Sequence, residues 1–378
     1  MKALLICFLF FVLTGCASPE TFCPSPMDPA WIDKNRDDGI FGRYYTDTLY
    51  QEVSFEHLRA YTCYRADLRK LGLSAEAYTL LCYDSNTRFP KDLPAGYDPA
   101  AELEWGKDPG LGIRTLHERG ITGKGVNIGI IDQTLVPHNE YAGRLRLYRN
   151  LDPENTDGSM HGAAVLSLAV GKTCGTAPEA NVYYIASPSM DADLDALRQL
   201  LDLNRSLAPE DKLDILSISQ GGYSAGTYAE MQALCAKQNI ALITCKDMGV
   251  FGPVGRRLHS DPNDPQAILP CFLYLYGSNG WQGTAEQKVC VPIDRRTLAA
   301  MSGADSYYHM PFGGSSWLPP YIAGVFALAR QIKPALTYPD FEALAVDTAR
   351  SVTVQTSGGT EYIFPLLDPP AMIEALQK

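Results

Sequence analysis

The sequence is poor in the patterns that mark nucleic-acid-binding and zinc-binding proteins. No run of basic residues occurs, and the formal net charge of -11 argues against a nucleic-acid partner, because phosphate binding needs clustered Lys and Arg. The chain has no CxxC or HxxxH pattern, which disfavours a zinc site. No internal repeat is present. With 378 residues, 46% hydrophobic and 20% charged, the chain has material for one large globular domain and a smaller appendage.

The N-terminus carries the pattern of a targeting segment. Lys2 precedes an apolar stretch, residues 3–13, that is too short to span a bilayer, so residues 1–15 are predicted to be a signal peptide. The stretch ends in Leu13-Thr14-Gly15-Cys16, which resembles the lipobox of bacterial lipoproteins. The resemblance implies that Cys16 is lipidated and anchors the mature protein to the extracytoplasmic surface of a bacterial membrane, without a spanning helix. An ordinary cleavable signal with an incidental cysteine is the alternative.

Disulfides are permitted in an exported protein, and this chain has ten cysteines. Those outside the N-terminal segment are even in number, but sequence alone cannot choose among their many pairings. Cys63–Cys82 and Cys271–Cys290 are expected as local pairs.

Composition divides the chain into segments. Residues 16–50, rich in Pro, Asp and Gly, are expected to form an irregular tether. Residues 51–105 are less polar and are predicted to be either a small accessory domain or a prosegment that assists folding. Residues 106–378 are predicted to form the main domain. Within it, residues 248–270 are rich in Gly, Pro and Asp and are expected to form a long loop.

Strand and helix patterns alternate from about residue 102. The near-continuous apolar run at residues 126–131 is typical of a buried parallel strand, and further strands are expected at residues 182–185, 213–219 and 240–244. Helices are expected between them, at residues 162–170, 192–207 and 227–237. This alternation predicts an α/β fold, with a mostly parallel sheet and helices on both faces. In such sheets, functional groups lie beyond the carboxyl ends of the strands.

Three candidate residues follow these elements. Asp132 comes directly after the first strand, and His161 stands at the start of an apolar helix. Ser316 follows a Gly-Gly turn and precedes a second apolar helix with prolines in its first turn. Each one taken alone is more simply read as a helix or strand cap, or as a packed side chain. Together they supply the nucleophile, the general base and the orienting acid of a hydrolase, in the order Asp, His, Ser.

The motifs around these residues resemble those of the subtilisin-like serine proteases, or subtilases. The similar segments are Gly123-Lys124-Gly125-Val126 through Asp132, His161-Gly162-Ala163-Ala164-Val165, and Gly314-Ser315-Ser316-Trp317-Leu318-Pro319-Pro320-Tyr321-Ile322-Ala323-Gly324. The resemblance covers roughly residues 108–350. It implies a subtilisin-like peptidase domain over residues 106–378, with Ser316 as nucleophile, His161 as general base and Asp132 as the acid that orients the histidine.

The resemblance also extends to the parts that hold the substrate. The segment Leu216-Ser217-Ile218-Ser219-Gln220-Gly221-Gly222 is similar to the substrate-binding strand, which implies that Ser217, Ser219 and Gly221 contact the substrate. Asp247 falls nearest the position of the family's oxyanion asparagine. No cofactor is implied. Many subtilases bind structural calcium, but no cluster of oxygen ligands in this sequence identifies a metal site.

Two functions therefore remain open at the level of sequence. The first is a lipid-anchored serine endopeptidase that acts on proteins or peptides. The second is a pseudoprotease, a binding or scaffold lipoprotein that keeps the fold without turnover. The missing asparagine and the large Trp317 and Leu318 after the nucleophile motivate this alternative. An esterase with the same triad is a weaker reading, because the chain's order and motifs differ from the GxSxG elbow.

Overall fold

The computed structural model describes residues 62–63, 68–69, 78, 81–155, 158–257, 260–269, 288–311, 313–355 and 361–378. The predicted signal peptide, Cys16 and the tether lie outside the described residues. Over the ranges that are described, no helix has the length and apolar character needed to cross a membrane.

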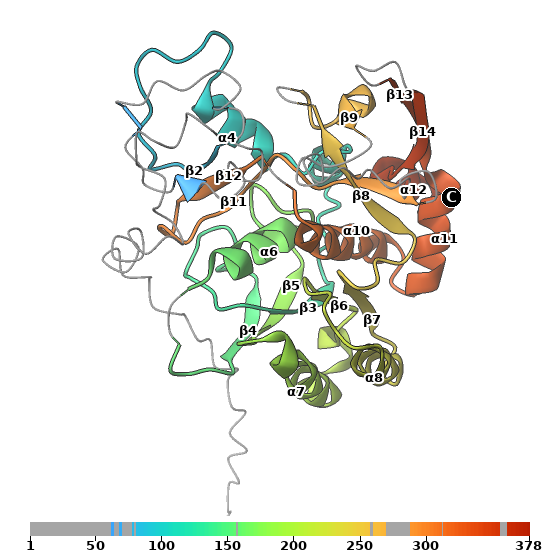
Figure 1. The fold of residues 1–378 in the computed structure, drawn as a ribbon. Coiled ribbons are helices and arrows are strands. Elements are labelled where there is room, and N and C mark those ends of the chain that lie inside the picture. Colours follow the sequence, from blue (N-terminus) through green and yellow to red (C-terminus); the bar gives the residue numbers. More distant parts are fainter. Residues whose placement is uncertain are drawn as a thin grey trace, which may run out of the picture.

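A five-stranded parallel sheet forms the centre of the molecule (Figure 1). Its strand order is β4-β5-β3-β6-β7, and every neighbouring pair is parallel. The strands are β3 (Asn127–Asp132), β4 (Leu145–Asn150), β5 (Asn181–Ala186), β6 (Ile215–Ile218) and β7 (Ala241–Thr244). The predicted α/β fold and parallel sheet are confirmed. β4, an edge strand with two exposed positions, was not among the predicted strands.

Helices cover both faces of this sheet (Figure 1). The helices α6 (Met160–Val170) and α10 (Leu318–Ile332) pack together on one face, and α7 (Asp193–Ser206) and α8 (Ala225–Ala236) lie on the other. Alternate residues of β3 enter the two cores. Ile130 joins the core that contains α6 and α10, whereas Ile131 joins the core that contains α7 and α8. A strand buried on both sides explains the continuous apolar run in the sequence.

A second sheet lies beside α10, with the strand order β13-β14-β10-β8-β9. Its strands are β8 (Phe251–Arg256), β9 (Ile268–Leu269), β10 (Val289–Pro292), β13 (Arg350–Gln355) and β14 (Glu361–Leu366). Three helices belong to the same half of the molecule: α5 (Ile113–Glu118), α11 (Tyr338–Thr348) and α12 (Pro369–Leu376).

The prediction of a long loop at residues 248–270 is wrong, because this segment contains β8 and β9. Pro253 and two glycines within β8 hide its strand pattern. A proline is tolerated there because β9 pairs only with the last two residues of β8, Gly255 and Arg256.

A third sheet joins the N-terminal part of the described chain to the main domain, in the order β1-β2-β12-β11. Its strands are β1 (Thr62–Cys63), β2 (Cys82–Asp84), β11 (Arg296–Ala299) and β12 (Tyr307–Met310). β2 pairs with β12, and α4 (Pro99–Lys107) packs on β11. Residues 81–105 are thus built into the same body as the rest of the chain.

Short 3₁₀ helices connect several elements. They are η2 (Met190–Ala192), η3 (Pro209–Asp211), η4 (Pro265–Ala267) and η6 (Ser315–Trp317).

The two expected disulfides are wrong. The thiol of Cys82 donates to Met310 Sδ, and that of Cys290 donates to the Lys288 carbonyl oxygen, each at 3.4 Å. Neither residue forms a disulfide. Cys63 stands opposite Tyr83 rather than Cys82 in the β1–β2 register, and Cys271 lies outside the described residues.

The packing of α10 against the segment that follows α6 generates a test of stability. A Cβ added at Gly324 of α10 would lie 2.5 Å from the Cβ of Thr176, which is fully buried. We therefore expect Gly324→Ala to lower the free energy of unfolding in urea by about 1–3 kcal/mol, because the helix must shift away.

Gly226 of α8 provides the matched control, since an added Cβ there meets only Ser224 Oγ, at 3.9 Å. Gly226→Ala should raise the free energy of unfolding by about 0.5–1 kcal/mol through helix propensity. Equal effects of the two substitutions would contradict the close packing assigned to Gly324.

Candidate active site

Asp132 and His161 meet at the carboxyl end of the central strand. Asp132 is the last residue of β3, and His161 lies in the first turn of α6. His161 Nδ1 and Asp132 Oδ1 are 2.7 Å apart, and the same oxygen accepts a hydrogen bond from the Gln133 N–H at 2.8 Å. Ser159 caps α6 by accepting from the His161 N–H at 3.0 Å. The cap and the carboxylate together hold the imidazole in one orientation.

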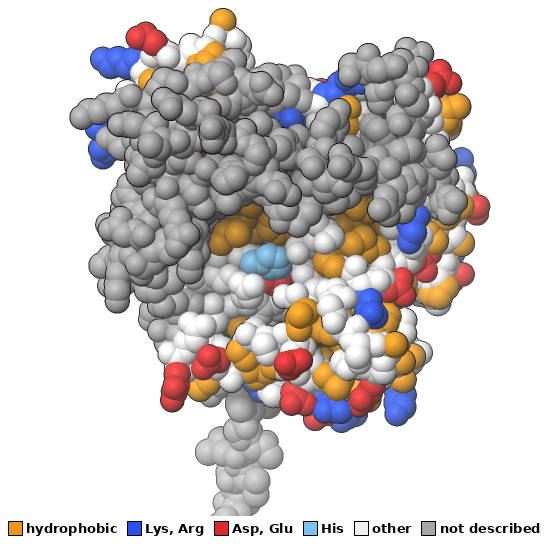
Figure 2. Space-filling view, in the orientation of Figure 1, with side chains coloured by type: hydrophobic (Ala, Val, Ile, Leu, Met, Phe, Trp, Pro, Cys, Tyr) orange, Lys and Arg blue, Asp and Glu red, His pale blue; other side chains and the backbone are white. Residues whose placement is uncertain are grey.

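The environment of His161 favours its protonated form. Burial alone would lower the pKa of His161, but the charge and the hydrogen bond of Asp132 outweigh it, so the pKa is raised above its ordinary value. The His161 side chain keeps 20% of its surface exposed, whereas that of Asp132 is fully covered. Figure 2 shows a histidine and an acidic side chain together in a hollow, with apolar side chains above them. A partly exposed imidazole over a buried carboxylate is suited to proton transfer.

Ser316 lies at the same edge of the sheet. It belongs to η6, which contacts α6 and runs directly into α10. Its hydroxyl donates to the Ser219 carbonyl oxygen at 3.3 Å, and the Ser219 hydroxyl donates to the Ser316 carbonyl oxygen at 2.8 Å. These two bonds attach η6 to the end of β6. The Ser316 hydroxyl is thereby directed toward Ser219 rather than toward His161, as is common before a substrate tightens such a site.

Trp317 forms a wall of this site that the sequence did not identify. Its indole ring lies 5.5 Å from the imidazole of His161, centroid to centroid, with the planes at 30°. The side chain is buried, and its Nε1 has no hydrogen-bond partner within the described part of the chain. The sequence offered one signal: a large aromatic residue directly after Ser316.

The loop after β7 places Cys245, and not Asp247, beside the serine. The Asp247 carboxylate is exposed and accepts from the Gly249 N–H at 3.0 Å, while its own N–H donates to Thr244 Oγ1 at 3.1 Å. Cys245 is half-buried, with the Ser315 and Ser316 hydroxyls in hydrogen-bonding reach of its sulfur. Burial raises the pKa of the Cys245 thiol to about 11, so the thiol is neutral near pH 7.

The residues assigned to substrate binding differ in their access to solvent. Ser217 is fully buried within the sheet, and the Ser219 hydroxyl donates its hydrogen bond to the Ser316 carbonyl oxygen. Gly221 is half-buried and lies against Cys245, because a Cβ added there would be 3.1 Å from the Cys245 carbonyl carbon. After β6, Gln220 and Gly221 are half-buried and Gly222 is exposed, and the Gln220 carbonyl oxygen accepts from the Cys245 N–H at 3.0 Å.

This backbone segment is held from the other side by α7. Tyr223, just after the segment, donates from its hydroxyl to Asp193 Oδ2 at 2.5 Å. Burial raises the pKa of the Asp193 carboxyl to about 6, although the Ser187 and Tyr223 hydroxyls oppose the shift. The Asp193–Tyr223 contact was not anticipated from the sequence, because no local pattern links α7 to this loop.

No described group of three or more His, Cys, Asp or Glu side chains could hold a metal ion.

Comparison with known proteins identifies the fold. No family model matches the chain. The serine protease AprX of Bacillus subtilis (strain 168) is 22% identical over 312 residues, which cover 70% of this chain and 69% of AprX. The subtilisin-like protease PopC of Myxococcus xanthus (strain DK1622) is 26% identical over 311 residues, which cover 70% of this chain and 64% of PopC. The match thus spans about two thirds of the length of each relative.

Comparison with solved structures supports the same fold. A subtilase cytotoxin SubAB structure superimposes with a TM-score of 0.51 at 13% identity, covering 72% of this chain and 96% of the other. The chain therefore has the subtilisin-like α/β fold.

The contact between Trp317 and His161 generates a prediction about protonation. The face of an aromatic ring attracts a cation by about 0.5–1 kcal/mol, which corresponds to about 0.4–0.7 pKa units. We expect the pKa of His161 to be higher in Trp317→Phe than in Trp317→Leu, since only phenylalanine keeps a ring. Proton NMR titration of the imidazole, with Ser316→Ala in both variants, measures this without requiring activity. Equal pKa values would show that Trp317 acts on His161 only by filling space.

Proposed function

We propose that this protein is a serine endopeptidase, with Asp132, His161 and Ser316 as its catalytic triad. The observation that carries the proposal is the hydrogen bond from His161 Nδ1 to the buried carboxylate of Asp132, at the sheet edge where Ser316 begins a buried helix. The similarity to AprX and PopC, both named as proteases, supports peptide bonds as the substrate.

The geometry suggests a division of roles. Because His161 Nδ1 is engaged by Asp132, the other ring nitrogen, Nε2, is left to take the proton of Ser316 Oγ. The oxygen then attacks the carbonyl carbon of the scissile bond, and the imidazolium returns its proton to the departing amine. A water molecule, activated by the same histidine, hydrolyses the acyl-enzyme. Since Asp132 raises the pKa of His161, kcat/KM should fall as the pH drops through that raised pKa.

The tetrahedral intermediate needs donors for its negative oxygen. The backbone N–H of Ser316, at the start of η6 and α10, is one candidate. Asp247 remains the residue aligned with the family asparagine, but an ionised carboxylate is only an acceptor. The neutral Cys245 thiol beside Ser316 is a weak donor that lies nearer. Loss of one strong donor typically lowers the rate by about 10²–10³, so we expect slow turnover.

Substrate would bind along the segment that follows β6. An extended peptide can add to the exposed backbone around Gly221 by β-augmentation, with Ser219 holding Ser316 in place. Because the Ser217 side chain is fully buried, any contribution it makes to substrate binding would be indirect, through the position of β6.

A pseudoprotease is the second candidate. The Ser316 hydroxyl directed at Ser219, and the lack of the family asparagine, are the observations that favour it. The retained pairing of Asp132 with His161 favours the enzyme, because a protein without turnover has no need of an oriented imidazole.

Covalent labelling separates the two candidates. The purified protein should react with a fluorophosphonate probe at Ser316, because attack on phosphorus needs the same activated oxygen. Ser316→Ala should abolish labelling, while Ser315→Ala, one residue away and exposed, should keep it. A folded protein that shows no labelling at Ser316 would establish the pseudoprotease.

We also propose that the chain is a lipoprotein tethered through Cys16 to a bacterial membrane. The support is the lipobox-like end of the N-terminal apolar segment.

Partitioning tests the anchor. In cells, the protein should fractionate with membranes, and Cys16→Ser should release it or leave the signal segment uncleaved, because no acyl chains can be attached. Cys23→Ser is the control and should behave as the parent protein does. If Cys16→Ser is processed normally and stays in the membrane fraction, the anchor lies elsewhere.

A further inference from the structure

A buried carboxylate lies behind the segment along which the substrate is proposed to bind. Asp193 is the first residue of α7 and is 3% exposed. Within the described ranges, it forms no ion pair with Lys, Arg or His. Acidic residues are favourable in the first turn of a helix, but they can be exposed there, as Asp195 of the same turn is. The position in the helix therefore does not explain the burial of Asp193.

Two hydroxyl groups stabilise the ionised form of this carboxylate. Tyr223 donates to Asp193 Oδ2 at 2.5 Å, and the Ser187 hydroxyl also lies in hydrogen-bonding reach. Because the Ser187 hydroxyl donates to the Ser189 carbonyl oxygen as well, at 3.0 Å, Tyr223 is the dedicated donor. A hydrogen bond to an ionised acceptor is about twice as strong as one between neutral groups.

Asp193 contacts the chains that leave two strands of the central sheet. Ser187 follows β5 directly, and its N–H donates to the Asp132 carbonyl oxygen at 2.8 Å. Tyr223 lies on the chain that leaves β6. Since β5 and β6 flank β3, Asp193 lies near the end of the strand that carries Asp132. Burial raises the pKa of the Asp193 carboxyl to about 6, and the charge of Asp132 adds to this shift.

The segment between β6 and Tyr223 depends on anchors at its two ends. At the first end, the Gln220 carbonyl oxygen accepts from the Cys245 N–H at 3.0 Å. Gly221 and Gly222 follow, and glycine has more conformational freedom than any other residue. The turn before α7 lies against them, because a Cβ added at Gly222 would be 2.9 Å from Met190 Sδ. The hydrogen bond from Tyr223 to α7 is the anchor at the second end.

We propose that Asp193 is a positioning residue for substrate binding, which acts through Tyr223 to hold the backbone of Gly221 and Gly222 in place. The inference rests on the proposed function only in taking this segment as the surface that binds a peptide. A peptide that meets an ordered segment loses less affinity to the ordering of the protein. Asp193 itself is buried and makes no contact with the substrate.

Peptide binding in the absence of turnover tests this role. The probe is fluorescein-labelled β-casein, an unfolded chain, and every protein in this arm carries Ser316→Ala. Saturable binding is expected by fluorescence anisotropy. Tyr223→Phe removes only the hydroxyl and should raise the Kd by about five- to tenfold, because a hydrogen bond to a charged acceptor is lost. Asp193→Asn keeps an acceptor oxygen and should raise the Kd by about two- to threefold.

The double variant tests whether Asp193 acts through Tyr223. Asp193→Asn combined with Tyr223→Phe should bind casein no more weakly than Tyr223→Phe alone, because both changes affect one hydrogen bond. Asp195→Asn is the matched control, as an exposed acid in the same turn of α7, and should leave the Kd unchanged.

Fluorophosphonate labelling of Ser316, in proteins that keep this serine, separates positioning from general damage. Tyr223→Phe should slow labelling by less than about threefold, because a small probe makes little use of remote binding contacts. Absence of labelling in the parent protein would contradict the proposed function, and the casein arm would still decide the role of Asp193.

Four results would each overturn the inference. They are a lack of saturable casein binding, a Kd for Tyr223→Phe within about twofold of the parent value, additive effects in the double variant, and a loss of labelling as large as the loss of binding.

Discussion

The burial of the central strand on both faces is the constraint on which the rest of the structure depends. β3 lies between β5 and β6, and its alternate residues Ile130 and Ile131 enter different cores. A parallel strand with apolar residues on both faces can present polar groups only where it ends. Asp132 is that end, and its side chain is fully covered. A carboxylate in such a place needs a partner, and His161 provides one.

The position of that partner follows from helix packing. α6 and α10 lie together on the same face of the sheet, and Gly324 of α10 permits a close approach to Thr176 in the segment after α6. Each helix begins at the carboxyl edge of the sheet, so His161 in α6 and Ser316 ahead of α10 arrive there together. Reciprocal hydrogen bonds between Ser219 and Ser316 then attach the serine turn to β6. The site is held by elements that are themselves buried, which favours a fixed geometry.

The predictable parts of the structure are those whose signal is local. The buried strands and the helices of the central sheet follow from apolar runs and spacing, and β3 and α6 lie within a residue or two of their predicted bounds. The third sheet escaped prediction because β2 and β12 lie far apart in the sequence and share no pattern. The pairing of Tyr83 with His309 is an example. Trp317 escaped as a partner of His161 because the contact between the two rings depends on how η6 and α6 pack together. Alignment alone likewise pointed to Asp247, whereas the turn after β7 brings Cys245 to the serine.

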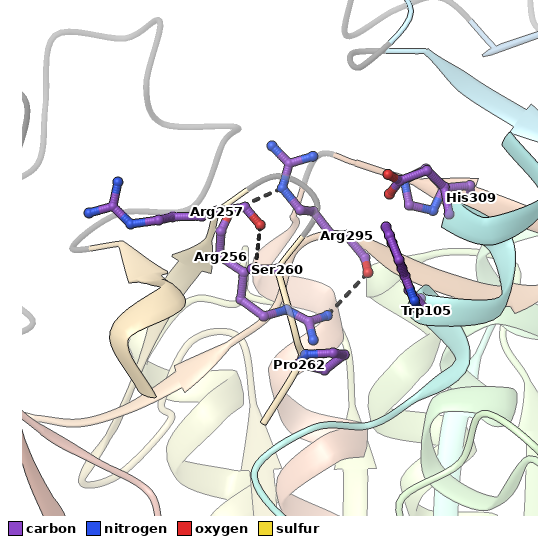
Figure 3. A pocket seen from close by; sticks show the side chains of 9 residues that line it. Trp105, Arg256, Arg257, Ser260, Pro262, Arg295 and His309 are labelled. Atoms are coloured by element: carbon purple, nitrogen blue, oxygen red, sulfur yellow. Dashed lines mark hydrogen bonds between the residues drawn. The ribbon is translucent and has the colours of Figure 1, made fainter. Parts of the chain in front are cut away.

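The protein stabilises the buried charges of Asp132 and Arg256 in different ways. At the sheet edge, Asp132 is compensated by His161, which retains some contact with solvent and can exchange a proton. Between the second and third sheets, the guanidinium of Arg256 donates to carbonyl oxygens (Figure 3), with the charge of Asp294 nearby, and its Nε has no acceptor among the described residues. Neutral carbonyl groups stabilise a buried cation less than a carboxylate does. The pair of Asp132 and His161 can therefore exchange a proton with solvent, whereas Arg256 carries its charge at a cost in stability.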